Sequence, residues 1–399
     1  MPARSLLKDP FYRRYWIALF ISQFGTWMQA TALGWLALKV TGRGSGVGAV
    51  LALLFLPSLF LSLPAGALAD RFPRARLLFF YQLGMALASA GLFYLVASGQ
   101  ATFLALKVFA LIYGSFSALE VPTRQAFNVE LAGRKRLAGA IALGSFSFNV
   151  ARVLAPGVAG LLIARAGLAV AFLLNALSFL PMLLFLLRVP AKAPARSAKG
   201  AWAALLEGFG YVRRTALVRW VLLMLFLVGT FGINFQAFVP AHARLVLGLD
   251  AEGYGFLLSA LGLGSLFGAS ISALATRVHP WWVPRGALLL AAALAGSAFF
   301  RTPASAAGLF VVAGAAMVLT LISANATVQA LVPEALRGRV MALYSLVLMG
   351  SGPPGMYLTG LAFDLFGGLA PLVLGGLTAL PALYFFFKPW PRTLTPVAG

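Results

Sequence analysis

The chain has 399 residues, of which 61% are hydrophobic and only 10% are charged. A soluble protein carries about 25% charged residues and could not hide so much apolar surface, so the expected solvent is lipid. The apolar runs do not alternate, which argues against a β-barrel, and the lack of cysteine excludes disulfides and thiol chemistry.

Apolar runs long enough to cross a bilayer recur along the whole chain, and they predict an all-α membrane protein. Twelve spans are expected, near residues 15–40, 46–69, 77–98, 102–127, 137–164, 168–187, 217–243, 253–275, 284–300, 305–332, 338–363 and 368–387. The basic stretch before the first span lacks a cleavage-site pattern, so it is interpreted as a cytoplasmic arm and not as a signal peptide.

A polar connection divides the predicted spans into two sets of six. We expect an N-terminal half at 1–187, a cytoplasmic linker at 188–214 and a C-terminal half at 215–399. The linker begins with prolines and basic residues and ends in a helix-prone stretch, 201–214, expected to lie along the membrane surface. The halves resemble each other at an offset of 204, through the pairs Trp16 and Trp220, Gly25 and Gly229, Gln125 and Gln329, and Glu130 and Glu334. Repeated halves around a midplane site are typical of alternating-access transporters.

The basic residues give an independent test of topology. With the N-terminus placed inside, 23 of the 31 Lys and Arg residues fall in inside segments and five in outside segments. Lys107, Arg124 and Arg152 remain within spans. Because cytoplasmic segments attract Lys and Arg, this bias predicts that both termini are cytoplasmic, in a cell membrane. It also explains the net charge of +22 without a nucleic-acid partner.

The loop after the second span is unusually charged for this chain. It carries one carboxylate and several guanidinium groups after a run of small residues: Gly66, Asp70, Arg71, Arg74 and Arg76. Such a loop at the cytoplasmic face is interpreted as a gate. The alternative is a simple topology anchor of basic residues.

These residues resemble the signature loop between spans 2 and 3 of the major facilitator superfamily, with Pro73 where glycine is usual. Further stretches, Ser22–Gln29, Pro122–Ala126 and Asn149–Arg152 with Pro156 and Gly160, resemble its twelve-span efflux branch of the transmembrane secretion effector type. That branch includes the enterobactin exporter and the macrolide efflux proteins. The resemblance covers the whole chain and implies a transporter, not an enzyme. It also implies that Asp70 faces the start of span 11, near Arg337, when the cytoplasmic side is shut.

Glu120, Arg124 and Arg152 are charged side chains inside predicted spans, and they are the candidates for proton coupling or for a charge in the cavity. A charge within the bilayer is expensive, so each is expected to face a cavity or a partner. Glu120 is interpreted either as a protonation switch or as a permanent brace with Arg124 at i+4. It is also a candidate partner for Arg152. The alternative for Arg152 is a structural ion pair that packs span 5.

Amides and aromatic rings recur within the spans. The candidate cavity residues are Gln23, Trp27, Gln29, Asn149, Asn234, Gln236, Asn325 and Gln329, with Phe231 and Phe235 beside them. Together they suit a bulky, partly apolar solute, although each amide alone could serve helix packing.

The sequence therefore predicts a proton-coupled secondary transporter that exports a hydrophobic or amphiphilic small molecule, such as a drug or a siderophore-like compound. The alternatives are an uncoupled facilitator or importer, a membrane scaffold and an intramembrane enzyme. No cofactor is expected, because there is no P-loop, and no metal, because His242 and His279 are far apart. The chain is expected to act as a monomer.

Overall fold

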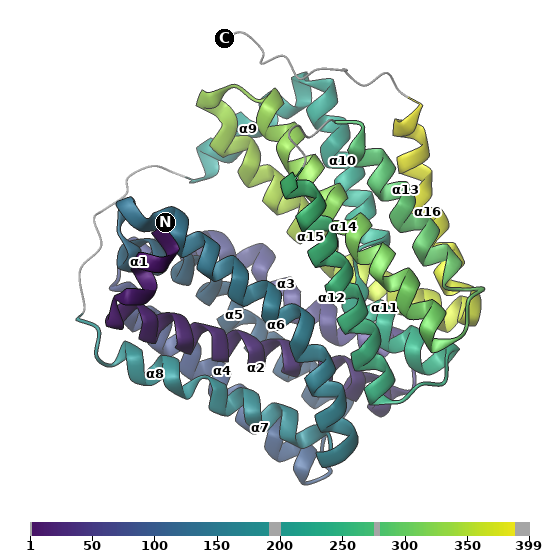
Figure 1. Cartoon of the computed structure of the whole chain (residues 1–399), viewed down its shortest axis with the longest axis horizontal. Helices are drawn as coiled ribbons and strands as arrows, with labels where there is room; N and C mark the ends of the chain where they lie inside the picture. Colours follow the sequence, from purple (N-terminus) through teal and green to yellow (C-terminus); the bar gives the residue numbers. More distant parts are fainter. Residues whose placement is uncertain (1, 191–200, 275–279, 388–399) are drawn as a thin grey trace. The chain divides into compact units, whose positions relative to one another are not determined.

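The computed structural model describes residues 2–190, 201–274 and 280–387, and every regular element in these ranges is a helix. The all-α fold predicted from the sequence is therefore confirmed. The helices are α1 (Pro2–Lys8), α2 (Pro10–Thr41), α3 (Gly44–Ala69), α4 (Arg74–Ala97), α5 (Phe103–Ala132), η1 (Arg134–Arg136), α6 (Leu137–Ala166), α7 (Leu168–Ser178), α8 (Leu180–Leu186), α9 (Ala201–Arg214), α10 (Ala216–Phe231), α11 (Phe235–Ala241), η2 (His242–Val246), α12 (Ala251–Leu274), α13 (Trp282–Gly296), α14 (Pro303–Leu331), α15 (Glu334–Phe366), η3 (Gly367–Leu369) and α16 (Ala370–Phe386) (Figure 1).

Nine stretches of the described helices are long and apolar enough to cross a membrane. One of them, Glu334–Phe386, holds two helices, α15 and α16. α13 is apolar but shorter, and α2, which carries Gln23 and Gln29, is not among the nine. Each of the twelve predicted spans coincides with a helix or a broken pair of helices, but the number that cross a membrane stays a prediction.

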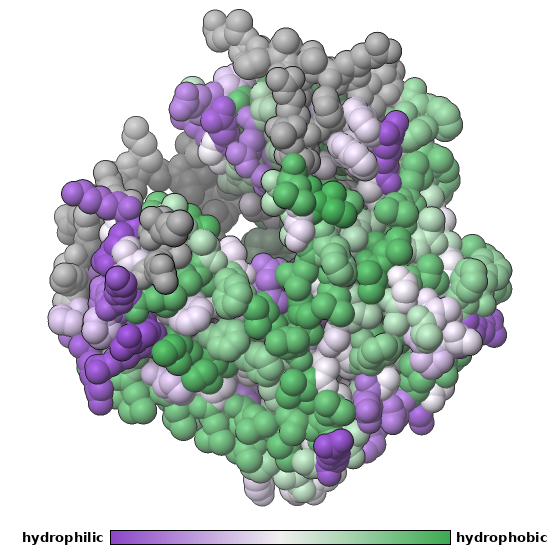
Figure 2. All heavy atoms as spheres, in the orientation of Figure 1, coloured by the Kyte–Doolittle hydropathy of each residue, from purple (hydrophilic) through white to green (hydrophobic). Residues whose placement is uncertain are grey.

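The helices present apolar side chains outward as well as inward. Figure 2 shows hydrophobic residues over much of the visible face. Large side chains that are more than half exposed include Phe60, Phe80, Leu87, Tyr94, Leu184, Phe267 and Leu380. So much exposed apolar surface is stable only in contact with lipid, which agrees with the composition.

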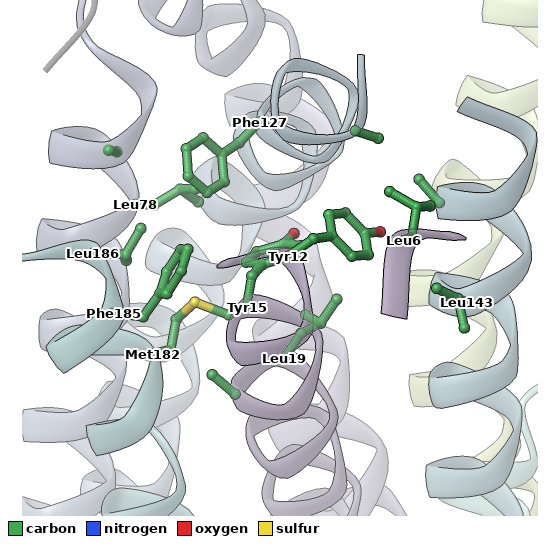
Figure 3. Packing of buried hydrophobic residues seen from close by; sticks show 14 residues of the cluster. Leu6, Tyr12, Tyr15, Leu19, Leu78, Phe127, Leu143, Met182, Phe185 and Leu186 are labelled. Carbon is green, nitrogen blue, oxygen red and sulfur yellow. The ribbon is translucent and has the colours of Figure 1, made fainter. Parts of the chain in front are cut away.

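The chain forms two compact units. Unit 1 comprises Met1–Gly42, Leu53–Ala198 and Asp250–Gly255. Its core lies where α2, α4, α5, α6 and α8 meet: Tyr12, Tyr15 and Leu19 of α2 pack with buried residues of the other four helices (Figure 3). Asp9 fixes the start of α2, because its carboxylate accepts hydrogen bonds from the backbone of Phe11 and Tyr12 and pairs with Arg136 at 3.4 Å.

Unit 2 comprises Arg43–Ala52, Lys199–Leu249 and Phe256–Gly399. The first turns of α3 therefore belong to it, where they pack against α15. A methyl group at Gly48 or Gly360 would collide with the backbone of the facing helix, so glycine is needed at both positions. The Asp364 carboxylate then caps α3 by accepting from the backbone N–H groups of Gly44 (2.6 Å) and Ser45 (3.1 Å).

Gly229 and Gly232 within the span predicted near 217–243 indicate a helix break, and the break is present, since α10 ends at Phe231 and α11 begins at Phe235. Asn234 fills this gap by donating its amide N–H groups to the carbonyls of Gly229 (2.9 Å) and Thr230 (2.7 Å). The sequence Pro353–Pro354–Gly355 is interpreted as a broken or kinked helix; α15 is not broken there, because it runs through both prolines. Prolines are tolerated inside membrane helices, because neighbouring groups can satisfy the backbone carbonyls that lose their donor.

His242 occupies an apolar site in unit 2. It is fully buried, with its ring 5.5 Å from that of Phe238 and 5.9 Å from that of Phe310. Neither ring nitrogen has a hydrogen-bond partner among the described residues. Because an unsatisfied buried polar group costs about 1–3 kcal/mol, His242→Phe is expected to raise the thermal unfolding midpoint of the detergent-purified protein. His242→Ala is the matched cavity control and should lower it; a lower midpoint for His242→Phe as well would contradict the argument.

Candidate functional site

A buried ion pair lies inside unit 1, between α4 and α5. Glu120 is 5% exposed, and its Oε1 accepts a hydrogen bond from Arg124 Nε at 2.8 Å, which is also their ion pair. The same oxygen accepts a second hydrogen bond from Gln82 Nε2 of α4, at 3.1 Å. Two donors on one oxygen stabilise the ionised carboxylate at a depth where an unpaired charge would be costly.

Gln82 was not among the residues predicted from the sequence. The contact between Gln82 and Glu120 joins two helices, α4 and α5, and depends on how they pack. No residue spacing along α4 predicts this contact. The i,i+4 spacing of Glu120 and Arg124, in contrast, places them on one face of a helix, and the structure pairs them as that spacing suggests.

Further polar groups are buried within unit 1. The hydroxyl of Tyr15 is buried without a hydrogen-bond partner among the described residues, and the hydroxyl of Tyr113 lies 3.5 Å from Thr26 Oγ1. Farther along, Asn175 donates to Ser89 Oγ at 3.3 Å and accepts from Ser178 Oγ at 3.1 Å. Unit 1 thus contains several buried polar groups within otherwise apolar helices.

Arg152 lies apart from this ion pair, at the middle of α6. Its Nη2 donates to Asn149 Oδ1 at 3.2 Å, and Asn149 donates in turn to the backbone carbonyl of Ser145 at 2.8 Å. Asn149 and Arg152 thus form a polar stripe on this helix. Glu120, the suggested partner of Arg152, pairs with Arg124 instead.

The loop after α3 forms a second charged cluster in unit 1. Arg74 donates to Glu130 Oε2 at 3.2 Å and to the carbonyl of Ala69 at 3.3 Å, and it lies 3.7 Å from Asp70 Oδ1. One guanidinium thus joins the end of α3, the start of α4 and the end of α5. Arg71 and Arg76 are exposed, and no ion pair of either is among those the structure describes. Gly66 has open space around it, so packing within unit 1 does not require glycine there.

The amides predicted in unit 2 separate into two groups. Asn325 and Gln329 of α14 line an open hollow of about 700 Å³, together with Arg337 and Tyr344 of α15. Gln329 Nε2 donates to Asn325 Oδ1 at 2.5 Å. Asn234, in contrast, is buried, and its amide N–H groups donate to carbonyls of α10. The structure therefore gives it a packing role and not a cavity position.

Of the remaining predicted cavity residues, Gln23, Trp27 and Gln29 belong to unit 1 and Gln236 belongs to unit 2. Trp27 is partly exposed and packs edge-on against Phe148, with ring centroids 5.6 Å apart. Gln29 is 3% exposed, and the side-chain oxygens of Gln23, Gln29 and Gln236 are buried without partners among the described residues. Phe235 is also buried, against Phe238 and Phe310, which corrects its expected place at a cavity. His279 and the first part of the predicted linker, 191–200, lie outside the described residues.

Residues 3–384 match the family described as transmembrane secretion effector. The staphyloferrin A transporter of Staphylococcus aureus is 25% identical over 62% of this chain, and the match spans 63% of the length of that relative. The enterobactin exporter EntS of Escherichia coli is 29% identical over 86% of this chain and 82% of its own length. Among solved structures, the nucleoside transporter NupG is 16% identical, covers 95% of this chain and all of its own, and has a TM-score of 0.74, which shows a shared fold.

Proposed function

We propose that this chain, which belongs to the transmembrane secretion effector family of major facilitator transporters, exports an amphiphilic small molecule in exchange for protons. Family membership supports membrane transport, while fold alone leaves cargo and coupling open. The observation that carries the coupling is the Glu120 carboxylate, held inside unit 1 with only 5% of its surface exposed.

The negative charge of the buried Glu120 carboxylate can be compensated in two ways. In the described arrangement Arg124 balances its charge at 2.8 Å, with Gln82 as a second donor. A rearrangement of α4 or α5 that withdrew these donors would leave a buried carboxylate, for which a bound proton is the remaining compensation. A carboxylate that exchanges an arginine for a proton as the helices move links proton binding to the transport cycle.

The cargo is proposed to be an amphiphile of the size of a siderophore or a drug. The named relatives are a transporter of staphyloferrin A and an exporter of enterobactin. Within unit 2, Tyr344 and the Asn325–Gln329 amide pair line one open hollow and offer it aromatic and hydrogen-bonding surface. Such a mixture suits a partly apolar solute that also carries polar groups.

A second candidate is an uncoupled facilitator. The short Glu120–Arg124 contact favours a facilitator, because a carboxylate that stays paired with an arginine throughout the cycle does not bind a proton. In either case we propose a monomer in the cell membrane, with both termini in the cytoplasm. The bias of Lys and Arg along the sequence supports this orientation.

Inside-out vesicles with an imposed pH gradient test the proposal. With an acidic lumen, protons leave the vesicle through the carrier, so fluorescent amphiphiles from a substrate screen should accumulate inside. Nigericin should collapse that accumulation. Uptake that stops at equal concentrations and ignores the gradient would instead identify a facilitator, and vesicles without the protein set the background.

A further inference from the structure

Arg152 is a positive charge deep in a membrane helix. It stands 15 residues after the start of α6 and 14 before its end, or about 20 Å from each at 1.5 Å per residue. Its side chain is partly exposed. It is therefore neither sealed in the core of unit 1 nor close enough to a helix end to reach water easily.

No acid of unit 1 balances this charge. The described ion pairs join Asp9 to Arg136, Asp70 and Glu130 to Arg74, and Glu120 to Arg124. Asp250 accepts from the backbone N–H of Gly253, and Glu252 is exposed in the first turn of α12. Since charges inside membranes are almost always paired, the missing counter-ion is itself a structural observation.

The donors of Arg152 are partly occupied. Nη2 donates to Asn149 Oδ1 at 3.2 Å, whereas Nε is buried and has no acceptor among the described residues. Nη1 makes no hydrogen bond among the described residues and is not buried, so the guanidinium keeps N–H donors for a charge-assisted bond to a carboxylate. Asn149 holds Nη2 and so orients the guanidinium.

Aromatic rings lie beside the same group. The Arg152 guanidinium carbon is 5.9 Å from the centroid of the Phe148 ring, and Phe148 meets Trp27 of α2 edge-on at 5.6 Å. Both rings are partly exposed. An apolar surface next to an uncompensated cation fits a molecule with a carboxylate joined to an apolar or aromatic body.

We propose that Arg152, oriented by Asn149 and flanked by Phe148 and Trp27, binds the carboxylate of the transported amphiphile. This inference rests on the proposed function and narrows its substrate class to organic acids. The bound carboxylate supplies the counter-ion that unit 1 lacks.

Equilibrium binding to the purified full-length protein in neutral detergent tests the site. The probes are dansylaminoundecanoic acid and its primary amide, which differ only in charge at the head group. The acid is expected to bind at least about 10-fold more tightly, the factor that one charge-assisted hydrogen bond provides. Arg152→Gln should remove the preference. Lys107→Gln, which deletes another positive charge from a helix of unit 1, should keep it.

Three outcomes would overturn the site. They are equal binding of acid and amide to the unchanged protein, an acid preference that survives in Arg152→Gln, and stronger competition by phosphatidylglycerol than by phosphatidylcholine. The last result would make a lipid phosphate the occupant. If Arg152→Gln fails to fold, a diazirine derivative of the acid decides: labelling should fall on α2 and α6, and labelling elsewhere contradicts the site. If the unchanged protein shows no acid preference but gradient-driven uptake is present, the site alone is refuted. If it prefers the acid but shows no gradient-driven uptake, the proposed export alone is refuted.

Discussion

Glu120→Gln is expected to abolish gradient-driven accumulation and to destabilise the protein. The amide cannot balance Arg124, whose guanidinium would be left as an unpaired charge beside a buried partner. Breaking one side of a buried ion pair costs about 3–5 kcal/mol. Transport in inside-out vesicles and thermal unfolding in detergent measure the two effects separately.

The double variant Glu120→Gln, Arg124→Gln distinguishes a proton carrier from a static brace. With both charges removed, no unpaired charge remains, so the unfolding midpoint should recover toward that of the unchanged protein. If Glu120 carries the proton, accumulation against the gradient stays lost while downhill exchange returns. Full recovery of accumulation would show that the pair only holds α5 together and that Glu120 is not the proton carrier.

The positions of the helices could be predicted because the bilayer sets their length. Each predicted span coincides with helix in the structure, and the break after Gly229 was visible as a glycine-rich interruption. Proline is harder to interpret, because it can either interrupt a membrane helix or lie within a continuous one. Pro353 and Pro354 suggested a broken or kinked helix, but α15 continues through both, as helices in lipid can where other groups satisfy the freed backbone.

Side-chain partners could be predicted within a helix but not between helices. The i,i+3 contact of Arg152 with Asn149 and the i,i+4 contact of Arg124 with Glu120 follow from helical geometry. The bond from Gln82 to Glu120 depends on how α4 packs against α5, which the sequence does not reveal. Asn234 was misplaced for a related reason, since an amide at a helix break can bond to the carbonyls that the break exposes.

Asp70→Asn is expected to slow transport at least about 10-fold while the unfolding midpoint stays nearly unchanged. The Asp70 side chain is 40% exposed and its contact with Arg74 is long, at 3.7 Å, so the pair adds less than about 1 kcal/mol to the fold. A large loss of rate with little loss of stability would place the carboxylate in the transport cycle, as the signature loop implies. Initial rates in vesicles, set against the amount of inserted protein, measure it.

Two neighbouring arginines supply the controls for Asp70. Arg74→Gln should lower both rate and stability, because Arg74 also binds Glu130 and the carbonyl at the end of α3. Arg76→Gln removes an exposed charge and should change neither. If Asp70→Asn transported at the unchanged rate, the loop would be a topology anchor. If it lost stability as Arg74→Gln does, Asp70 would belong to the fold of unit 1 and not to a gate. A loss of transport rate without a loss of stability would assign the Asp70 carboxylate to the change between conformational states. A contact that forms in one state shifts the equilibrium between the states without stabilising the state that lacks it.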